Sequence, residues 1–265
     1  MTIRVCVAGA TGWVGRPLCA AIAAAPDLEL VGAVSRSAKG RRVEDVLAIP
    51  GAEVSISGSV EEALAAPTDA LVDFTHAAAV KANVLAALRR GVCVVIGSSG
   101  LTDADFEEIR QAALERQVGV VAAGNFAMTA VLLQSFACQA ARYLTQWEII
   151  DTAADIKQDA PSGTARELAY RLSEIRAPQV TVPPEATVGE PASRGVALNG
   201  SQVHSIRLPG YTIAVDIAFG ADGERLTLRQ EAGSSAAPYV QGTLLAIRKV
   251  GGVVGLVRGL DRILD

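Results

Sequence analysis

"VCVAGATGWVG", residues 5–15, decides the fold of this chain. An apolar run rich in valine is typical of a buried strand, and Gly9, Gly12 and Gly15 follow it where a helical pattern begins. Glycine here permits a tight turn and close approach to a pyrophosphate, which free N–H groups and the helix dipole stabilise. Tight packing alone is the competing explanation. The predicted phosphate-binding loop comprises Gly9, Thr11, Gly12, Trp13, Val14 and Gly15.

The first 125 residues alternate apolar runs with helical patterns, as in a series of βαβ units. The predicted strands are almost continuously apolar, as expected for a parallel sheet that is covered on both faces. Predicted helices include residues 14–25, 77–90 and 102–116. We therefore predict the α/β class, with a Rossmann dinucleotide-binding domain over residues 1–126.

The pattern changes after a predicted helix at residues 127–143. Several predicted strands, joined by a proline-rich stretch at 177–194, indicate an antiparallel or mixed sheet in a second, α+β domain. We place this domain at residues 127–238, and we expect residues 239–265 to pack back on the first domain.

The end of the second predicted strand reads "VSRSAKGRR", residues 34–42. An acidic residue here commonly binds the ribose 2′-hydroxyl of NAD, whereas Ser35, Arg36 and Ser37 with several further cations suit the 2′-phosphate of NADP. An ordinary solvated basic loop is the alternative. We predict NADPH as the cofactor.

Composition excludes several classes of function. A net charge of −4 and an isoelectric point near 5.4 argue against a nucleic-acid-binding protein, and the apolar runs are too short or too interrupted to span a bilayer. The four cysteines lie far apart in apolar runs, which indicates structural thiols and no metal site. We expect a soluble cytoplasmic protein.

"IKQDAPSGTA", residues 156–165, brings a cation and a helix N-terminus close together in the chain. Lys157 precedes a proline-bounded turn, and a Ser-Gly-Thr backbone then opens a helix predicted over residues 164–176. This combination is typical of an anion site, although Asp159 is more simply explained as a turn residue. The predicted anion-binding residues are Lys157, Ser162, Gly163 and Thr164.

Together these motifs resemble the dihydrodipicolinate reductase family, the 4-hydroxy-tetrahydrodipicolinate reductases of lysine biosynthesis. The similarity runs from end to end, and its further segments are "VDFTHAAAV" at 72–80, "VIGSSG" at 95–100, "AAGNFAM" at 122–128 and "VHSIRLPG" at 203–210.

The resemblance implies an NADP-dependent oxidoreductase that reduces a cyclic imine carboxylate. Its substrate carboxylates would meet the residues of the predicted anion site. It further implies a homotetramer built through the sheet of the second domain. The remaining cofactor contacts that it implies are Asp73, Phe74, Thr75, Gly97, Ser99, Gly124, Asn125 and Phe126.

The sequence departs from the family at the catalytic histidine pair, whose positions hold Ala153 and Ala154. The chain has only two histidines: His76 is either a loop residue or a neighbour of the nicotinamide, and His204 is either structural or substrate-facing. Lys157 is the remaining candidate for the catalytic proton donor.

Three hypotheses follow from this departure. The first is a reductase of another imine, or of an iminium ion that carries its own proton, with low lysine-pathway activity. The second is a genuine lysine-biosynthesis reductase that uses Lys157 or water as the acid. The third is a non-catalytic NADP-binding protein.

Overall fold

The computed structural model describes residues 2–210 and 213–264, and its chain forms two compact units. One unit comprises residues 1–127 and 236–265, and the other comprises residues 128–235. The last helix and strand of the chain therefore belong to the same unit as the first strand. No helix in the described part of the chain has the length and apolar character that crossing a membrane requires.

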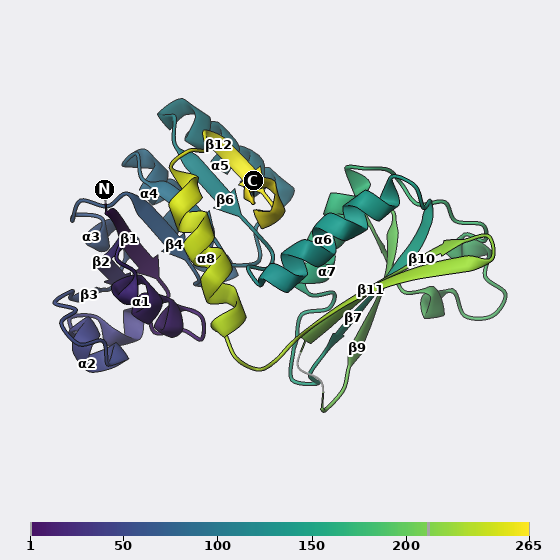
Figure 1. Ribbon diagram of the computed structural model, residues 1–265, viewed down its shortest axis with the longest axis horizontal. Coiled ribbons are helices and arrows are strands. Elements are labelled where there is room, and N and C mark those ends of the chain that lie inside the picture. Colours follow the sequence, from purple (N-terminus) through teal and green to yellow (C-terminus); the bar gives the residue numbers. More distant parts are fainter. Residues whose placement is uncertain (1, 211–212, 265) are drawn as a thin grey trace. The chain divides into compact units, whose positions relative to one another are not determined.

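The first unit is built on a seven-stranded sheet in which all strand pairs are parallel (Figure 1). The strand order is β12-β6-β5-β4-β1-β2-β3. This topology confirms the predicted Rossmann-type architecture. The strands are β1 (Ile3–Ala8), β2 (Leu28–Val34), β3 (Ile56–Ser57), β4 (Ala70–Asp73), β5 (Cys93–Ile96), β6 (Gly119–Ala122) and β12 (Gly255–Arg258).

Helices cover both faces of this sheet, which is why its strands are apolar at consecutive positions. Helices α1 and α8 pack against each other, and α8 crosses β4, β5 and β6, while α4 packs between α3 and α5 (Figure 1). The α-helices are α1 (Gly15–Ala24), α2 (Val43–Leu47), α3 (Val60–Ala63), α4 (Ala77–Arg89), α5 (Asp103–Arg116) and α8 (Ala237–Val250). Short 3-10 turns form at η1 (Arg36–Ala38) and η4 (Leu260–Ile263).

The order of the strands creates a topological switch point between β1 and β4. From β1 the chain first adds β2 and β3 on one side, then returns to add β4, β5 and β6 on the other. In open α/β sheets, ligands bind outside the carboxyl ends of the strands at such a point. The loops that follow β1, β2, β4, β5 and β6 all lie at this edge, because the strands are parallel.

The second unit contains a mixed five-stranded sheet in the order β11-β10-β7-β9-β8. β7 and β9 are parallel and the other pairs are antiparallel, so of the two predicted arrangements, antiparallel or mixed, the sheet is mixed. The strands are β7 (Gln146–Ala153), β8 (Val196–Leu198), β9 (Ser201–Arg207), β10 (Ile213–Ala221) and β11 (Glu224–Ala232). Two 3-10 turns, η2 (Pro184–Ala186) and η3 (Pro191–Arg194), interrupt the proline-rich stretch.

Two helices, α6 (Met128–Ala141) and α7 (Gly163–Ser173), pack against each other and against the sheet of the second unit. Leu168 and Leu172 of α7 are fully buried against Ile149, Ile217 and Phe219 of the sheet. Alternation along each strand therefore sends every second side chain into this core. The same alternation places Asp151, two residues after Ile149, on the helix-covered face.

The burial of the cysteines supports the predicted structural role. Cys6 and Cys19 are completely buried, and this burial raises the pKa of each thiol to about 12. Cys93 and Cys138 are partly buried. Because the thiolate is the reactive form, Cys6 and Cys19 are chemically inert at neutral pH.

Candidate functional site

The glycine loop after β1 is shaped by close backbone contacts. Gly9 has φ +82°, and a Cβ atom there would lie 2.3 Å from the Phe74 carbonyl oxygen. A Cβ atom on Gly15 would lie 2.1 Å from the Gly9 carbonyl oxygen. Packing thus requires glycine at both positions, while Gly12 is exposed at the tip of the turn.

Helix α1 begins directly after this loop. Val14 is its N-cap residue, and its side chain makes no capping hydrogen bond within the described part of the chain. The Arg16 N–H of the first turn donates to the Gly12 carbonyl at 3.1 Å, and Pro17 has no N–H, so the Gly15 N–H and the positive end of the helix dipole are what this helix end offers to an anion. Trp13, beside them, is half-exposed and contacts Tyr239 of α8 edge-on at 5.5 Å between ring centroids.

Three hydroxyl side chains connect the loops after β1 and β2. The Oγ1 atom of Thr11 lies 2.7 Å from the Oγ atom of Ser35, which in turn lies 3.2 Å from the Oγ atom of Ser37. Ser35 is buried, whereas Ser37 is exposed. The structure thus brings the predicted phosphate loop and the predicted ribose-binding residues together.

Arg36 also lies at this edge of the sheet, and its guanidinium contacts a residue that sequence reasoning left undecided. The Nη2 atom of Arg36 lies 3.1 Å from the Nε2 atom of His76, which precedes α4. Arginine can only donate, so the Nε2 atom of His76 accepts this hydrogen bond. Two further cations of the basic loop form ion pairs with carboxylates: Lys39 with Glu62 at 2.7 Å and Arg42 with Glu44 at 3.4 Å.

Asp73, the last residue of β4, is completely buried. Its Oδ1 atom accepts hydrogen bonds from the Thr75 backbone N–H at 3.0 Å, the Thr75 hydroxyl at 2.7 Å and the Ser98 hydroxyl at 2.5 Å. Asn83 of α4 donates to its Oδ2 atom at 2.7 Å. A direct contact between Asp73 and a cofactor stays a prediction, while its hydrogen bonds show that it organises the two loops. Ser98 and Asn83 were missed by sequence reasoning.

Aromatic packing holds the loops after β4, β5 and β6 together. The rings of Phe74 and Phe126 meet edge-on with centroids 5.7 Å apart. A Cβ atom on Gly97 would lie 2.1 Å from the Phe74 ring, which explains the glycine. Of the remaining predicted contacts, Ser99 and Gly124 are exposed at the same edge.

Asn125 supports this arrangement from inside the first unit. It is 3% exposed, and its Oδ1 atom accepts a hydrogen bond from the Ala127 N–H at 2.8 Å. It also forms a hydrogen bond with Tyr239, whose pKa is raised because burial outweighs that bond. Tyr239 was not predicted, because its place beside Asn125 depends on the return of α8 to the first unit.

The predicted anion site forms the turn between β7 and α7. The Lys157 N–H donates to the Ala154 carbonyl at 3.1 Å, and the Lys157 Nζ atom lies 2.6 Å from the Asp159 Oδ1 atom. Lys157 keeps 28% of its side chain exposed. An incoming carboxylate would therefore meet a partly accessible ammonium group that Asp159 already contacts.

Helix α7 begins at this turn with its own cap. Ser162 is the N-cap residue, and its Oγ atom accepts a hydrogen bond from the Ala165 N–H at 3.3 Å. Gly163 and Thr164 are the first residues of α7, where backbone N–H groups point out of the helix end. The structure thus brings Lys157 and the predicted Ser-Gly-Thr backbone together in one turn.

Two charged residues that sequence reasoning missed fasten this turn to the sheet. Asp151 of β7, 1% exposed, accepts hydrogen bonds on Oδ2 from the Ser162 N–H at 2.8 Å and from Arg207 Nη2 at 2.8 Å. Arg207, the last residue of β9, also donates to the Asp159 carbonyl at 2.7 Å. Burial acts to raise the pKa of Asp151, but the hydrogen bonds from Arg207 and Ser162 outweigh it and lower that pKa.

The two alanines at the family's histidine positions lie at the end of β7. Ala153 is completely buried and pairs with Ile213 and Arg207 in the flanking strands. Ala154 follows the strand and is partly exposed. Neither side chain can donate a proton. Lys157 is the first residue after them in the chain whose side chain carries N–H donors.

His204 lies on the other face of this sheet. Its Nε2 atom lies 2.7 Å from Glu148 Oε2, and Arg194 lies 2.8 Å from Glu148 Oε1. Burial acts to raise the pKa of Glu148, but the hydrogen bonds from Arg194 and His204 lower it. His204 pairs in register with Ile150, so alternation places its side chain opposite to that of Asp151, which supports a structural role.

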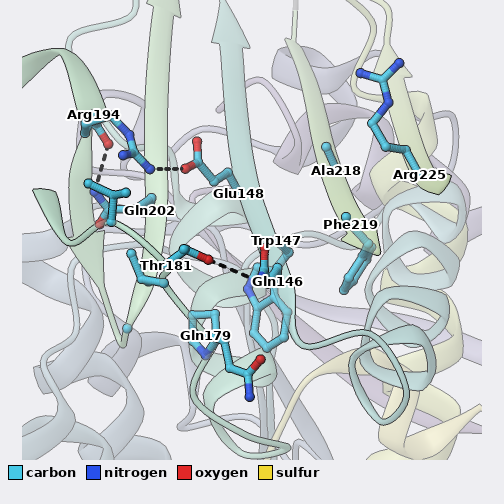
Figure 2. A pocket seen from close by; sticks show the side chains of 15 residues that line it. Gln146, Trp147, Glu148, Gln179, Thr181, Arg194, Gln202, Ala218, Phe219 and Arg225 are labelled. Carbon is cyan, nitrogen blue, oxygen red and sulfur yellow. Dashed lines mark hydrogen bonds and ion pairs between the residues drawn. The ribbon is translucent and has the colours of Figure 1, made fainter. Parts of the chain in front are cut away.

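A pocket in the second unit lies near the start of β7 (Figure 2). Its lining includes Gln146, Trp147, Gln179 and the Arg194–Glu148 ion pair. The predicted anion site follows the opposite end of the same strand. The pocket is therefore distinct from the predicted site, and none of the residues predicted from the sequence line it.

Comparison with known proteins agrees with this geometry. Residues 3–126 match the family model of the dihydrodipicolinate reductase N-terminus, and residues 129–264 match that of its C-terminus. The 4-hydroxy-tetrahydrodipicolinate reductase of Desulfitobacterium hafniense is 39% identical over 265 residues, with 99% of each chain covered. The enzyme of the same name from Moorella thermoacetica is 39% identical over 266 residues, covering 100% of this chain and 98% of its own.

A solved structure extends the similarity to three dimensions. The dipicolinate-bound dihydrodipicolinate reductase from Paenisporosarcina sp. TG-14 superposes with a TM-score of 0.80 at 31% identity, and all of both chains is covered. The two family models, the identity along the full length and the two-unit fold agree with one another. The chain therefore belongs to the dihydrodipicolinate reductase family, and it is an oxidoreductase of the kind that uses a nicotinamide cofactor.

Proposed function

We propose that this protein is an NADPH-dependent reductase of the C=N bond in a cyclic imine or iminium carboxylate. The observation that carries the proposal is the turn between β7 and α7, where Lys157 and the first residues of α7 remain while Ala153 and Ala154 replace the histidine pair. An anion site without an imidazole suits a carboxylated substrate that needs no proton from a histidine.

The preference for NADPH over NADH is the second part of the proposal. Ser35, Arg36 and Ser37 follow β2, where a carboxylate would repel a 2′-phosphate. Arg36 is exposed, and His76 orients its guanidinium at 3.1 Å. These contacts favour a phosphorylated ribose, because a guanidinium binds phosphate through several N–H donors.

In the proposed reaction, the residues of the chain perform two tasks: they bind the substrate and they supply a proton. When bound, the nicotinamide supplies the hydride that reduces the C=N carbon. Lys157 and the N-terminal backbone of α7 hold the substrate carboxylate and so orient the C=N bond. A cyclic imine that is protonated in water brings its own proton, and for other imines Lys157 is the candidate donor.

The main alternative is the lysine-pathway reductase itself, with Lys157 or a water molecule as the acid. Relatives at 39% identity over the full length carry that name, which favours it. A protein that binds NADP without catalysis is a weaker alternative, since such a protein has no need of the anion-binding turn.

Steady-state oxidation of NADPH against a panel of cyclic imine carboxylates tests the proposal, with the lysine-pathway intermediate included. We expect higher kcat/KM on a preformed iminium carboxylate than on that intermediate. Turnover of the intermediate as fast as in relatives that keep both histidines would instead establish the lysine-pathway assignment. Absence of turnover on every compound, together with tight NADPH binding, would favour the non-catalytic alternative.

The assembly and the roles of the two units are also proposals. We infer that the first unit binds the cofactor and the second binds the substrate, and that four copies associate through the sheet of the second unit. The packing of α6 and α7 against one face of that sheet supports this, since the other face can then meet a copy. Light scattering after size-exclusion chromatography measures the mass of the assembly directly.

We also propose a cytoplasmic location, which rests on the pattern of the cysteines.

A further inference from the structure

We propose that Asp73 is a positioning residue for the nicotinamide, and that its buried charge favours the oxidised, cationic ring over the reduced, neutral ring. The proposal rests on the nicotinamide cofactor of the family. It depends neither on the preference for NADPH nor on the identity of the substrate.

The carboxylate of Asp73 fixes two neighbouring loops. Its Oδ1 atom accepts from the backbone N–H and hydroxyl of Thr75, which follows β4, and from the hydroxyl of Ser98, which follows β5. The Ser98 Oγ atom also accepts from the Thr75 N–H at 2.7 Å. Because β4 and β5 are adjacent, these shared hydrogen bonds make the two loops one rigid surface.

Both oxygens of the Asp73 carboxylate accept hydrogen bonds. Its Oδ1 atom meets a backbone N–H and its Oδ2 atom meets the side-chain amide of Asn83, so both oxygens act as acceptors. Within residues 2–210 and 213–264, every group that hydrogen-bonds to this carboxylate is neutral. Buried charges in proteins are normally paired with an opposite charge, so this one favours any positive charge that binds nearby.

The fold indicates which part of the cofactor lies above Asp73. A dinucleotide lies across the switch point with its pyrophosphate at the turn between β1 and α1, and the residues after β2 contact the adenosine ribose. The other half of the cofactor would then lie over β4 and β5, which are on the opposite side of β1 from β2. This half carries the nicotinamide.

The charge of the ring changes during the reaction. A bound nicotinamide would be neutral in its reduced form and cationic in its oxidised form, and the fixed carboxylate of Asp73 in the protein interior would stabilise the cationic form. Tighter binding of the oxidised form, relative to the reduced form, also makes the bound reduced cofactor a stronger hydride donor. This is the direction that a reductase requires.

Isothermal titration of D73N with NADP⁺ and NADPH, without substrate, tests the proposal. We expect the ratio of Kd for NADP⁺ to Kd for NADPH to rise about tenfold over the wild type, as for loss of one charge acting through the protein interior. An unchanged ratio, with both affinities reduced equally, would show that Asp73 only holds the loops and would overturn the proposal. If D73N does not fold, Asp73→Ser also removes the charge without presenting a second amide to Asn83.

Ser98→Ala is the matched control, because it removes one hydrogen bond to Asp73 and keeps the charge. We expect it to weaken both cofactor forms by the same factor. A shift of the ratio as large as in D73N would assign the effect to loop geometry and refute the electrostatic claim. If the protein does not prefer NADPH, the same ratio of Kd values can be measured with NAD⁺ and NADH. Failure of the proposed preference for NADPH therefore remains distinguishable from failure of the proposal about Asp73.

Discussion

Arg207 donates to the carboxylate of Asp151 at 2.8 Å while also donating to the Asp159 carbonyl at 2.7 Å. One guanidinium thus connects the end of β9, the end of β7 and the turn that leads into α7. Because Asp151 also receives the Ser162 N–H, the turn that carries Lys157 is fixed from two sides. The geometry of the proposed anion site therefore depends on an ion pair that itself lies largely out of solvent.

Replacing Arg207 with methionine should strongly destabilise the protein. The substitution keeps an apolar stem but leaves Asp151 buried without its cationic partner, which costs about 3–5 kcal/mol of the free energy of unfolding. Urea unfolding at pH 7 measures the loss. R225M, at an exposed position of strand β11, is the control and should change the free energy of unfolding by less than about 0.5 kcal/mol.

The effect of this substitution should depend on pH. The pKa of Asp151 is lowered in the folded protein, so its contribution to stability is complete above its ordinary pKa of about 4 and is lost as the pH falls below that value. The gap in free energy of unfolding between wild type and R207M should therefore narrow on acidification from pH 7 to about pH 3. A gap that widens in acid would contradict the assigned ion pair.

Replacing Lys157 with alanine should reduce kcat/KM on carboxylated imines while leaving the Kd of NADPH nearly unchanged. Loss of a charged contact to the substrate costs about 2–5 kcal/mol of transition-state stabilisation. Initial rates and cofactor titration measure the two quantities. Unimpaired kcat/KM on all accepted imines would remove Lys157 from the site.

Two further variants extend this experiment: Asp159→Asn tests the partner of Lys157, and Lys81→Ala is the control. Asp159 contacts the Lys157 ammonium at 2.6 Å, so D159N should lower KM for a carboxylated substrate by removing the competing anion. Lys81 forms ion pairs with Asp105 and Glu108 on the first unit, and K81A should leave both kinetic constants unchanged. An increased KM in D159N would mean that Asp159 orients Lys157 for the substrate.

Replacing Arg36 with alanine should weaken NADPH binding and leave NADH binding unchanged. A hydrogen bond to a charged group contributes about 1.5–3 kcal/mol, and only NADPH carries the 2′-phosphate. Calorimetric titration of both cofactors gives the two Kd values. Arg42→Ala is the control, because Arg42 pairs with Glu44, and equal weakening of NADH in R36A would exclude a phosphate contact.

Introducing histidine at positions 153 and 154 should raise turnover of the lysine-pathway intermediate. Position 154 is partly exposed and can accept the ring, whereas Ala153 is completely buried, so A153H also displaces neighbours in the core. We therefore expect A154H to fold normally and A153H/A154H to lose stability. Stopped-flow oxidation of NADPH, with thermal unfolding of each variant, separates the gain in rate from the loss of folded protein.

The sequence by itself determined the features that depend on neighbours in the chain. The alternation of apolar runs with helical patterns gave the Rossmann-type unit, because a buried parallel strand and a covering helix each have their own periodicity. The order of residues 157–164 likewise placed Lys157 and the start of α7 in one turn. The segments that carry the family resemblance were also readable, and the comparisons confirm that family.

Only the tertiary structure decided which side chains connect those segments. Asp73 contacts Ser98 across two adjacent strands, and Arg207 reaches Asp151 because β9 pairs in parallel with β7. No local pattern specifies these pairs, since the residues lie 25 and 56 positions apart and a one-residue change of register would turn each side chain to the other face. The contact between His76 and Arg36 likewise joins residues that are far apart in the chain. Periodicity is a property of successive residues, whereas these contacts require the strand order and register that only packing of the whole unit establishes.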